Sequence, residues 1–143
     1  MAICVFGSLN IDLAIRAPRL PQPGETLSGH GFVTLPGGKG ANQAAAAARL
    51  GTIVQMVGRV GADDFGQQLL QSLQQQNVRT ENIAIDASTH SGIAIITVAD
   101  RGENQIVLAA GANGGVDVND VARLIPFLQD SSVLLLQLEV PTL

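Results

Sequence analysis

Several hydrogen-bonding side chains follow apolar segments of the chain, and their types suit a ligand rich in hydroxyl groups. Asn10 and Asp12 come shortly after the apolar run Ile3–Phe6, and Glu139 comes shortly after Val133–Leu136. A carboxylate accepts hydrogen bonds, whereas an amide both donates and accepts them. Each group alone is typical of an Asx-turn or of a surface acid. Together with the glycine-rich segment that follows Leu35, they favour a binding rim at the carboxyl ends of strands.

That segment, LPGGKGANQAAAAARLG at residues 35–51, combines glycines and alanines with the polar side chains of Lys39, Asn42 and Gln43. Small residues allow the backbone to approach a ligand closely. Two common nucleotide-binding motifs are excluded. Gly40 stands where a Walker A loop needs Ser or Thr, and Gln43 stands where the dinucleotide fingerprint needs its third glycine. The segment therefore predicts a helix N-terminus with free N–H groups, which suits hydroxyl groups or anions.

An α/β framework is expected to position these groups. Buried strands are predicted at Ile3–Phe6, Ile53–Val57 and Val133–Leu136, and helices at Ala41–Leu50, after Asp63-Asp64, and from Asp117 or Asn119 toward Ile125. Strands that alternate with helices are typical of a parallel sheet covered on both faces. Further β segments are predicted at Leu13–Ala17, at Thr26–Leu35, and as a hairpin of Ser91–Ala99 with Gln105–Ala109. The sequence thus predicts an α/β layer that carries a small β appendage.

Composition limits the partners and the compartment. The chain has 143 residues, a net charge of −4 and 46% hydrophobic residues, which suits one folded domain. Because no Lys/Arg cluster occurs, nucleic acid and anionic membranes are excluded as expected partners. Cys4 is the only cysteine, and no signal peptide or membrane-spanning run is recognisable, so a cytoplasmic protein is expected. His30 and His90 are interpreted as ordinary surface histidines.

Five stretches carry a resemblance to a known family: FGSLNIDL at 6–13, PGE at 23–25, GGKGANQAAAAARLG at 37–51, VGRVGADDFG at 57–66 and QLE at 137–139. In this order and spacing the sequence resembles the amino-terminal half of the ribokinase and PfkB-type sugar kinase family. The resemblance covers residues 1–143. It implies a ribokinase-like layered fold, with a mostly parallel sheet flanked by helices and a small β-sheet lid. The lid segments would lie near residues 13–35 and 91–109.

The resemblance also implies a sugar-binding site. Its members would be Asn10, Ile11, Asp12, Gly37, Gly38, Lys39, Gly40, Ala41, Asn42 and Glu139. Asn10, Asp12 and Asn42 would bind sugar hydroxyl groups, and Glu139 would complete the pocket. The glycines would bring backbone N–H groups against the sugar, and Ala94 and Ile96 would be apolar lid positions facing it. No metal ligands are expected.

The activity implied by the resemblance is transfer of the ATP γ-phosphoryl group to the primary hydroxyl of ribose. The family's Gly-Ala-Gly-Asp motif, which carries the general base, does not occur in these residues, so no catalytic residue is expected in this chain. ATP and Mg²⁺ are implied cofactors, a monovalent cation is compatible with the family, and a homodimer through the lid is implied. Two alternatives stay open: a kinase for another sugar or nucleoside, and a truncated non-catalytic sugar-binding or dimerisation module.

Overall fold

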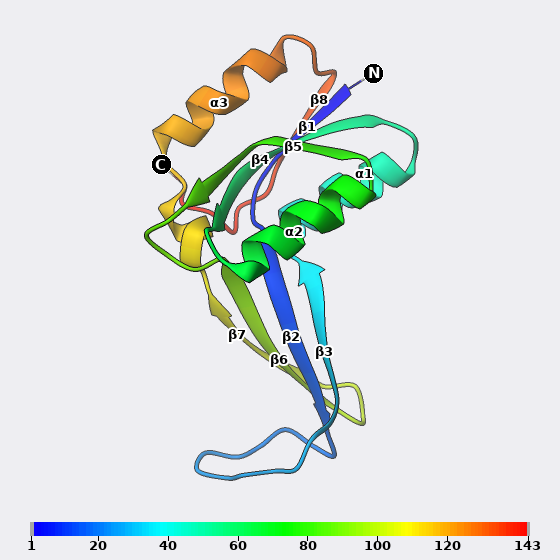
Figure 1. Ribbon diagram of the computed structural model, residues 1–143. Helices are drawn as coiled ribbons and strands as arrows, with labels where there is room; N and C mark the ends of the chain where they lie inside the picture. The colour runs from blue at the N-terminus through cyan, green and yellow to red at the C-terminus, as the bar shows by residue number, and fades with distance from the viewer. Residues whose placement is uncertain (1, 143) are drawn as a thin grey trace.

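The computed structural model describes residues 2–142, so Met1 and Leu143, the ends of the predicted domain, lie outside the described residues. Its first sheet is parallel throughout and has the order β5-β4-β1-β8 (Figure 1). The strands are β1 (Ala2–Phe6), β4 (Ile53–Gly61), β5 (Val78–Asp86) and β8 (Val133–Leu136). Because these strands are parallel, the segments that leave β1 and β8 emerge at one edge, where Asn10 and Glu139 follow.

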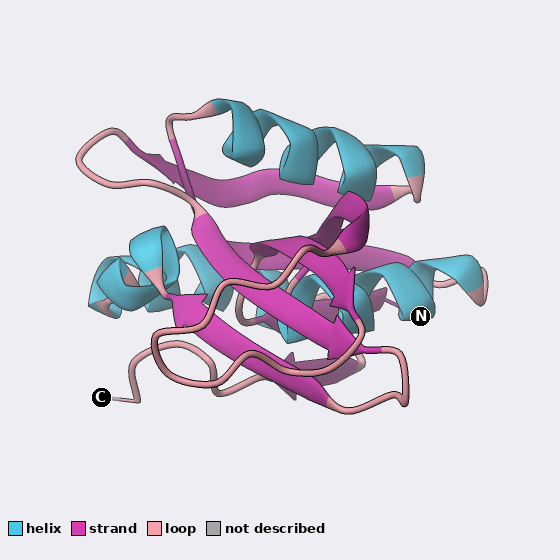
Figure 2. Cartoon of the chain, turned by 90° about the horizontal axis from the view of Figure 1, so that it is seen from below, coloured by secondary structure: helices cyan, strands magenta, loops and turns pink. Residues whose placement is uncertain are grey.

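A second sheet projects from this layer, as Figures 1 and 2 show from two directions. Its strands are β2 (Asn10–Ala17), β3 (His30–Gly37), β6 (Gly92–Ala99) and β7 (Asn104–Ala109), in the order β3-β2-β6-β7. The β2 strand pairs antiparallel with β3 and parallel with β6, and β6 forms an antiparallel hairpin with β7. The predicted β appendage is therefore one mixed four-stranded sheet.

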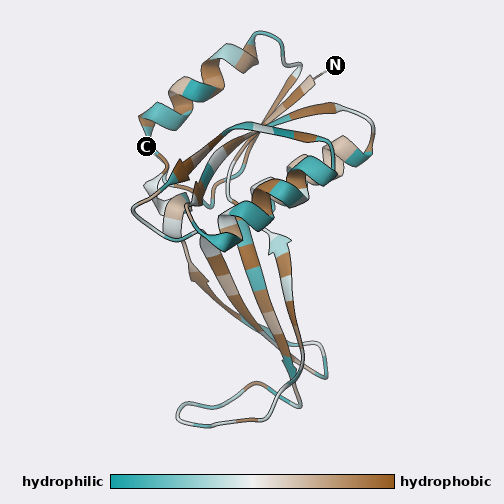
Figure 3. Cartoon of the chain, in the orientation of Figure 1, coloured by the Kyte–Doolittle hydropathy of each residue, from teal (hydrophilic) through white to brown (hydrophobic). Residues whose placement is uncertain are grey.

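Helices cover both faces of the first sheet. α1 (Lys39–Arg49) and α2 (Asp64–Gln75) pack on one face and α3 (Val118–Leu128) on the other, while the short 3₁₀ helix η1 (Gly111–Gly115) follows β7. Alternation along β1 sends Val5 into a core with Ala44 and Leu69, and sends Cys4 into a core with Leu124. The glutamine-rich outer face of α2 is hydrophilic (Figure 3), as expected of a solvated helix.

A partly buried ion cluster ties α3 to the first sheet. Arg59 in β4 has only 15% of its side chain exposed, and its Nε lies 2.7 Å from Oδ2 of the fully buried Asp120. The same guanidinium lies 3.0 Å from Asp117 and 3.6 Å from Asp86. Arg123 contacts the other Asp120 oxygen at 2.8 Å. Asp117 and Asp120 also form the capping box that starts α3, so the cluster fixes both the helix and its position.

Several element predictions need correction. The β2 strand begins at Asn10 and not at Leu13, and so includes Asp12. The third strand runs over His30–Gly37, and α1 begins at Lys39 and not at Ala41. The β5 strand was not predicted at all. Within residues 2–142, no helix is long and apolar enough to cross a membrane.

Candidate functional site

A cavity of about 360 Å³ lies where the start of α1, the exits of β1 and β8, and the second sheet meet. Binding pockets for small ligands commonly measure about 300–1,000 Å³, so a monosaccharide-sized molecule fits this range. The lining residues come from every one of these elements: Asn10, Asp12, Gly38, Lys39, Asn42, Ala94, Ile96, Ile106, Leu108 and Glu139. Eight of these ten were predicted from the sequence.

One wall of the cavity is polar and carries a charged pair. Lys39 Nζ donates a hydrogen bond to Oε1 of Glu139, although the two residues are 100 positions apart. The buried hydroxyl of Ser8 lies 3.0 Å from Oε2 of the same carboxylate. Burial alone would raise the pKa of Glu139, but the hydrogen bonds from Lys39 and Ser8 outweigh it and the pKa is lowered. Glu139 is therefore held as a carboxylate that is able to accept hydrogen bonds.

The opposite wall is the inner face of the second sheet, and Asp12 stands on it among apolar neighbours. In the strand register, Asp12 pairs with Leu35 on one side and with Ala94 on the other, and Ala94 in turn pairs with Leu108. Burial, followed by the charge of Glu139, raises the pKa of Asp12. A carboxylate in such surroundings gains from any hydroxyl group that donates to it.

Ile106 and Leu108 line the cavity, although they were not predicted as site residues from the sequence. They pair with Ile96 and Ala94 across the β6–β7 hairpin, and cross-strand partners point to the same face of a sheet. Residues 105–109 read QIVLA, an almost continuous apolar run, so no alternation in the sequence distinguished these two positions from Val107. These four side chains give the site an apolar cover suited to the C–H surface of a ligand.

The structure gives the bare glycine loop a packing role that was not predicted from the sequence. Gly38 has a φ of 93°, and a Cβ there would lie 2.7 Å from the backbone nitrogen of Asn10. A Cβ at Gly40 would lie 2.7 Å from the backbone nitrogen of Ser8, and one at Gly37 would collide with the Asp12 carboxylate. The glycines thus allow α1 to pack against the connection between β1 and β2. Of the loop glycines, only Gly38 lines the cavity.

The remaining predicted site residues do not line this cavity. Ile11 is fully buried in the core, because alternation along β2 turns it away from Asn10 and Asp12. Gly37, Gly40 and Ala41 are also buried, and none of them lines this cavity. Gln43 of the glycine-rich segment is exposed and does not line the cavity. His30 and His90 are also exposed, in agreement with their interpretation as surface histidines.

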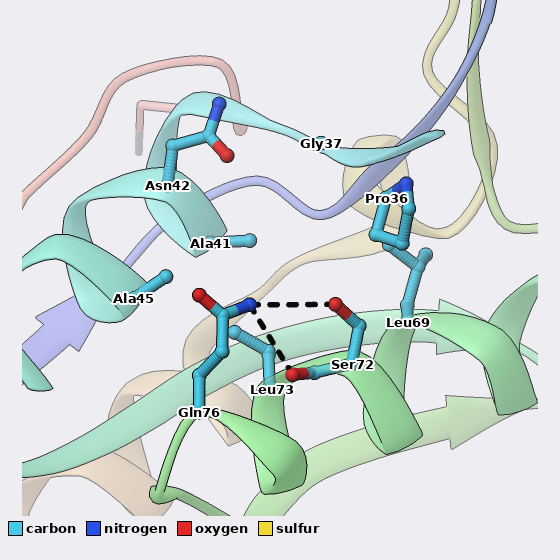
Figure 4. Close-up of a pocket in the computed structure, with 9 residues that line it drawn as sticks. All are labelled: Pro36, Gly37, Ala41, Asn42, Ala45, Leu69, Ser72, Leu73 and Gln76. Atoms are coloured by element: carbon cyan, nitrogen blue, oxygen red, sulfur yellow. Dashed lines mark hydrogen bonds between the residues drawn. The ribbon is translucent and has the colours of Figure 1, made fainter. Parts of the chain in front are cut away.

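A second cavity, between α1 and α2, is far smaller (Figure 4). Its volume of about 20 Å³ holds roughly one water molecule. Gln76 donates from Nε2 to the backbone oxygen of Ser72 at 3.2 Å, while its buried Oε1 has no partner within residues 2–142. This cavity is too small for a sugar.

Metal coordination has no evident position in the described part of the chain. Among residues 2–142, no group of three or more His, Cys, Asp and Glu side chains is arranged to hold a metal ion. Asp12 and Glu139 are the two carboxylates at the cavity, and Lys39 already neutralises one of them. The donor set fits hydroxyl groups better than a divalent cation.

Together these features define a class: an α/β domain whose small-molecule site lies under a β-sheet cover. Residues 2–137 match the model of the pfkB family carbohydrate kinases. The chain belongs to this family.

Similar proteins agree in sequence and in fold. The chain is 42% identical over 139 residues to "Ribokinase" of Bacillus subtilis and 43% identical over 145 residues to "Ribokinase" of Schizosaccharomyces pombe, each match covering 97% of this chain. It covers 47% and 46% of those two proteins, and so spans about half the length of the curated relatives it matches. The structure of Arabidopsis thaliana ribokinase complexed with ribose and ATP aligns with a TM-score of 0.82 at 32% identity, over 97% of this chain and 46% of that one. The predicted resemblance and fold class are confirmed.

Proposed function

We propose that residues 1–143 form the sugar-binding half of a kinase that transfers the γ-phosphoryl group of ATP to the primary hydroxyl of ribose. One observation carries this proposal: the cavity brings the polar side chains of Asp12, Lys39, Asn42 and Glu139 together with aliphatic side chains of the second sheet. A sugar has both kinds of surface, hydroxyl groups at its edge and C–H groups on its faces. The names of the relatives support ribose as the first substrate to test.

Each lining residue has a role in this proposal. Asp12 and Glu139 accept hydrogen bonds from sugar hydroxyl groups, and Lys39 and Asn42 donate to them. The apolar side chains of β6 and β7 cover the sugar and exclude water, which protects the transferred group from hydrolysis. The second sheet is thus proposed as the lid, within the predicted sugar-binding part at residues 1–143.

The nucleotide half of the reaction is proposed to lie in a further Gly-Ala-Gly-Asp segment, which residues 1–143 do not contain. ATP supplies the phosphoryl group, and Mg²⁺ would neutralise its developing charge; a monovalent cation is compatible with the family. Without the general base and the nucleotide site, this chain alone is proposed to bind the sugar without phosphorylating it. That outcome would match the alternative of a non-catalytic sugar-binding module.

We also propose that two copies of the chain form a homodimer through the lid. The proposed compartment is the cytoplasm. Beyond Asp12, the inner face of the second sheet carries apolar side chains that are largely exposed, among them Val33, Leu35 and Ile106 at 44%, 52% and 54%. Contiguous exposed apolar area of this kind is typical of an interaction surface. A second lid covering the first would bury these side chains.

A panel of ligands tests the substrate and separates the alternatives. Isothermal titration of the 143-residue chain is expected to give the tightest binding with ribose, weaker binding with 2-deoxyribose and with a nucleoside, and no ATP-dependent turnover of any of them. Tighter binding of the nucleoside would favour the other-substrate kinase. Turnover that survives removal of contaminating kinases would contradict the assignment of the nucleotide site to a further segment.

A further inference from the structure

Asn113 is a buried asparagine whose role no motif explains. It lies in η1, directly after the lid strand β7, and only 2% of it is exposed. Its side chain makes three hydrogen bonds to residues about a hundred positions earlier. Oδ1 accepts from the Leu9 N–H at 2.9 Å, and Nδ2 donates to the Leu9 carbonyl at 2.9 Å and to Asn10 Oδ1 at 2.8 Å.

These bonds determine which way two amides face. A backbone N–H is only a donor, so the Asn113 atom that faces the Leu9 N–H must be the oxygen. The Asn113 nitrogen then faces Asn10, and the Asn10 atom bonded to it must be its oxygen. Asn10 is therefore left with its Nδ2 group for other partners. Asn10 lines the cavity, and within residues 2–142 no acceptor is bonded to that nitrogen.

Glycines flank this amide pair on both sides. In the strand register, Asn10 pairs with Gly37 in β3 and with Gly92 in β6. A Cβ at Gly92 would collide with both Asn10 Oδ1 and Asn113 Nδ2, and would lie 2.7 Å from the Leu9 carbonyl oxygen. Only a glycine leaves room for the hydrogen bond between the two side chains. The bond between the two amides thus depends on residues of three elements, β2, β6 and η1.

We propose that Asn113 is a positioning residue for sugar binding. It holds the oxygen of the Asn10 amide and so presents the Asn10 N–H₂ group to the cavity as a donor to an oxygen of the ligand. Together with the acceptor Asp12, this gives β2 one fixed donor and one fixed acceptor on the same face. The proposal rests on the proposed sugar site and adds to it a residue outside the cavity.

A double-mutant cycle tests the coupling. Asn113→Asp keeps the acceptor for the Leu9 N–H but replaces the donor to Asn10 and to the Leu9 carbonyl by an oxygen. Asn10 then turns and presents its own oxygen to the cavity. We expect this variant to bind ribose about tenfold more weakly than the unchanged chain, measured by calorimetry. In an Asn10→Ala background, Asn113→Asp should change ribose binding by less than about twofold, because no amide remains to be positioned.

Two comparisons make the result specific. Thr80→Val removes a partly buried hydrogen bond from Gln74, which is 2.9 Å long and does not involve the cavity, and should leave ribose binding unchanged. Gly92→Ala should weaken ribose binding like Asn113→Asp, because it forces the two amides apart. Equal losses for Asn113→Asp in both Asn10 backgrounds, or no loss in either, would overturn the proposal.

Failure of the proposed function is recognisable separately. An unchanged chain that does not bind ribose contradicts the sugar site itself. The orientation of Asn10 is then decided by NMR, because the ¹⁵N resonance of its side-chain amide should shift in Asn113→Asp and stay in place in Thr80→Val. An unshifted resonance in Asn113→Asp would overturn the positioning role.

Discussion

Replacing Asp12 by asparagine is expected to weaken ribose binding by about 1.5–3 kcal/mol, or about 10- to 150-fold. The carboxylate stands in an apolar row of the second sheet, between Leu35 and Ala94, and faces the cavity. A hydroxyl group that donates to it forms a charge-assisted hydrogen bond, which the neutral amide of asparagine cannot replace. Calorimetric titration with ribose measures the loss.

The same substitution is expected to stabilise the ligand-free protein at neutral pH. Burial, and then the Glu139 charge, raises the pKa of Asp12 above its usual value of 3.8. When the pKa of a carboxyl is higher in the folded than in the unfolded state, the free energy of unfolding falls as the pH rises through that pKa. Near neutral pH the charge of the Asp12 carboxylate therefore opposes folding, and its replacement by a neutral amide raises the free energy of unfolding. Below the usual pKa the carboxyl is protonated in both states, so the difference between the two proteins should vanish.

Thermal unfolding at several pH values checks this sign. Asp130→Asn, which removes an exposed carboxyl, is the matched control and should leave ribose binding unchanged. If a folded Asp12→Asn variant binds ribose as tightly as the unchanged chain, Asp12 has only a structural role. A variant less stable than the unchanged chain at neutral pH would contradict the electrostatic argument.

Replacing Arg59 by methionine is expected to cost about 3 kcal/mol or more of the free energy of unfolding. Methionine keeps much of the side-chain volume but leaves the fully buried Asp120 without its closest cation, at 2.7 Å. Removal of one partner from a buried ion pair is costly, because the remaining charge stays away from water. The effect should be large although Arg59 lies outside the cavity.

Denaturant unfolding measures the loss, and two further variants identify its cause. Arg123→Ala removes a cation that is 46% exposed and should cost only about 1 kcal/mol or less. Adding Asp120→Asn to Arg59→Met should recover part of the stability, because the buried charge is then gone. A loss below about 1 kcal/mol for Arg59→Met alone would mean that the cluster contributes little.

Much of the fold could be predicted because local pattern and tertiary position agree. The apolar run of β1, the alanines of α1 and the turn at residues 100–104 each specify one kind of structure. β5 was missed because Arg79, Glu81 and Asn82 interrupt its apolar pattern, and the register shifts opposite Gln55 and Val57. The β2 strand was expected to begin only at Leu13, since Asn and Asp are rare in strands, yet pairing with β3 and β6 extends it back to Asn10.

The parts of the site that belong to recognisable motifs could be predicted from the sequence. The parts that depend on contacts between residues far apart in the sequence could not. The glycine loop and the polar groups after β1 and β8 are visible in the sequence. The packing of Gly38 and Gly40 on residues 7–10 is not, because it depends on how α1 meets the sheet. Asn113 gives no sequence signal either, since its partners Leu9 and Asn10 are 104 and 103 positions away.

Mapping ribose by ¹H–¹⁵N NMR titration of the chain tests the central claim most directly, that the cavity under the second sheet is a sugar site. The account predicts saturable shifts concentrated at Asn10, Asp12, Lys39, Asn42 and Ala94, with α3 unaffected. Absence of any saturable shift would contradict the account, as would shifts confined to the small cavity around Ala45 and Leu69.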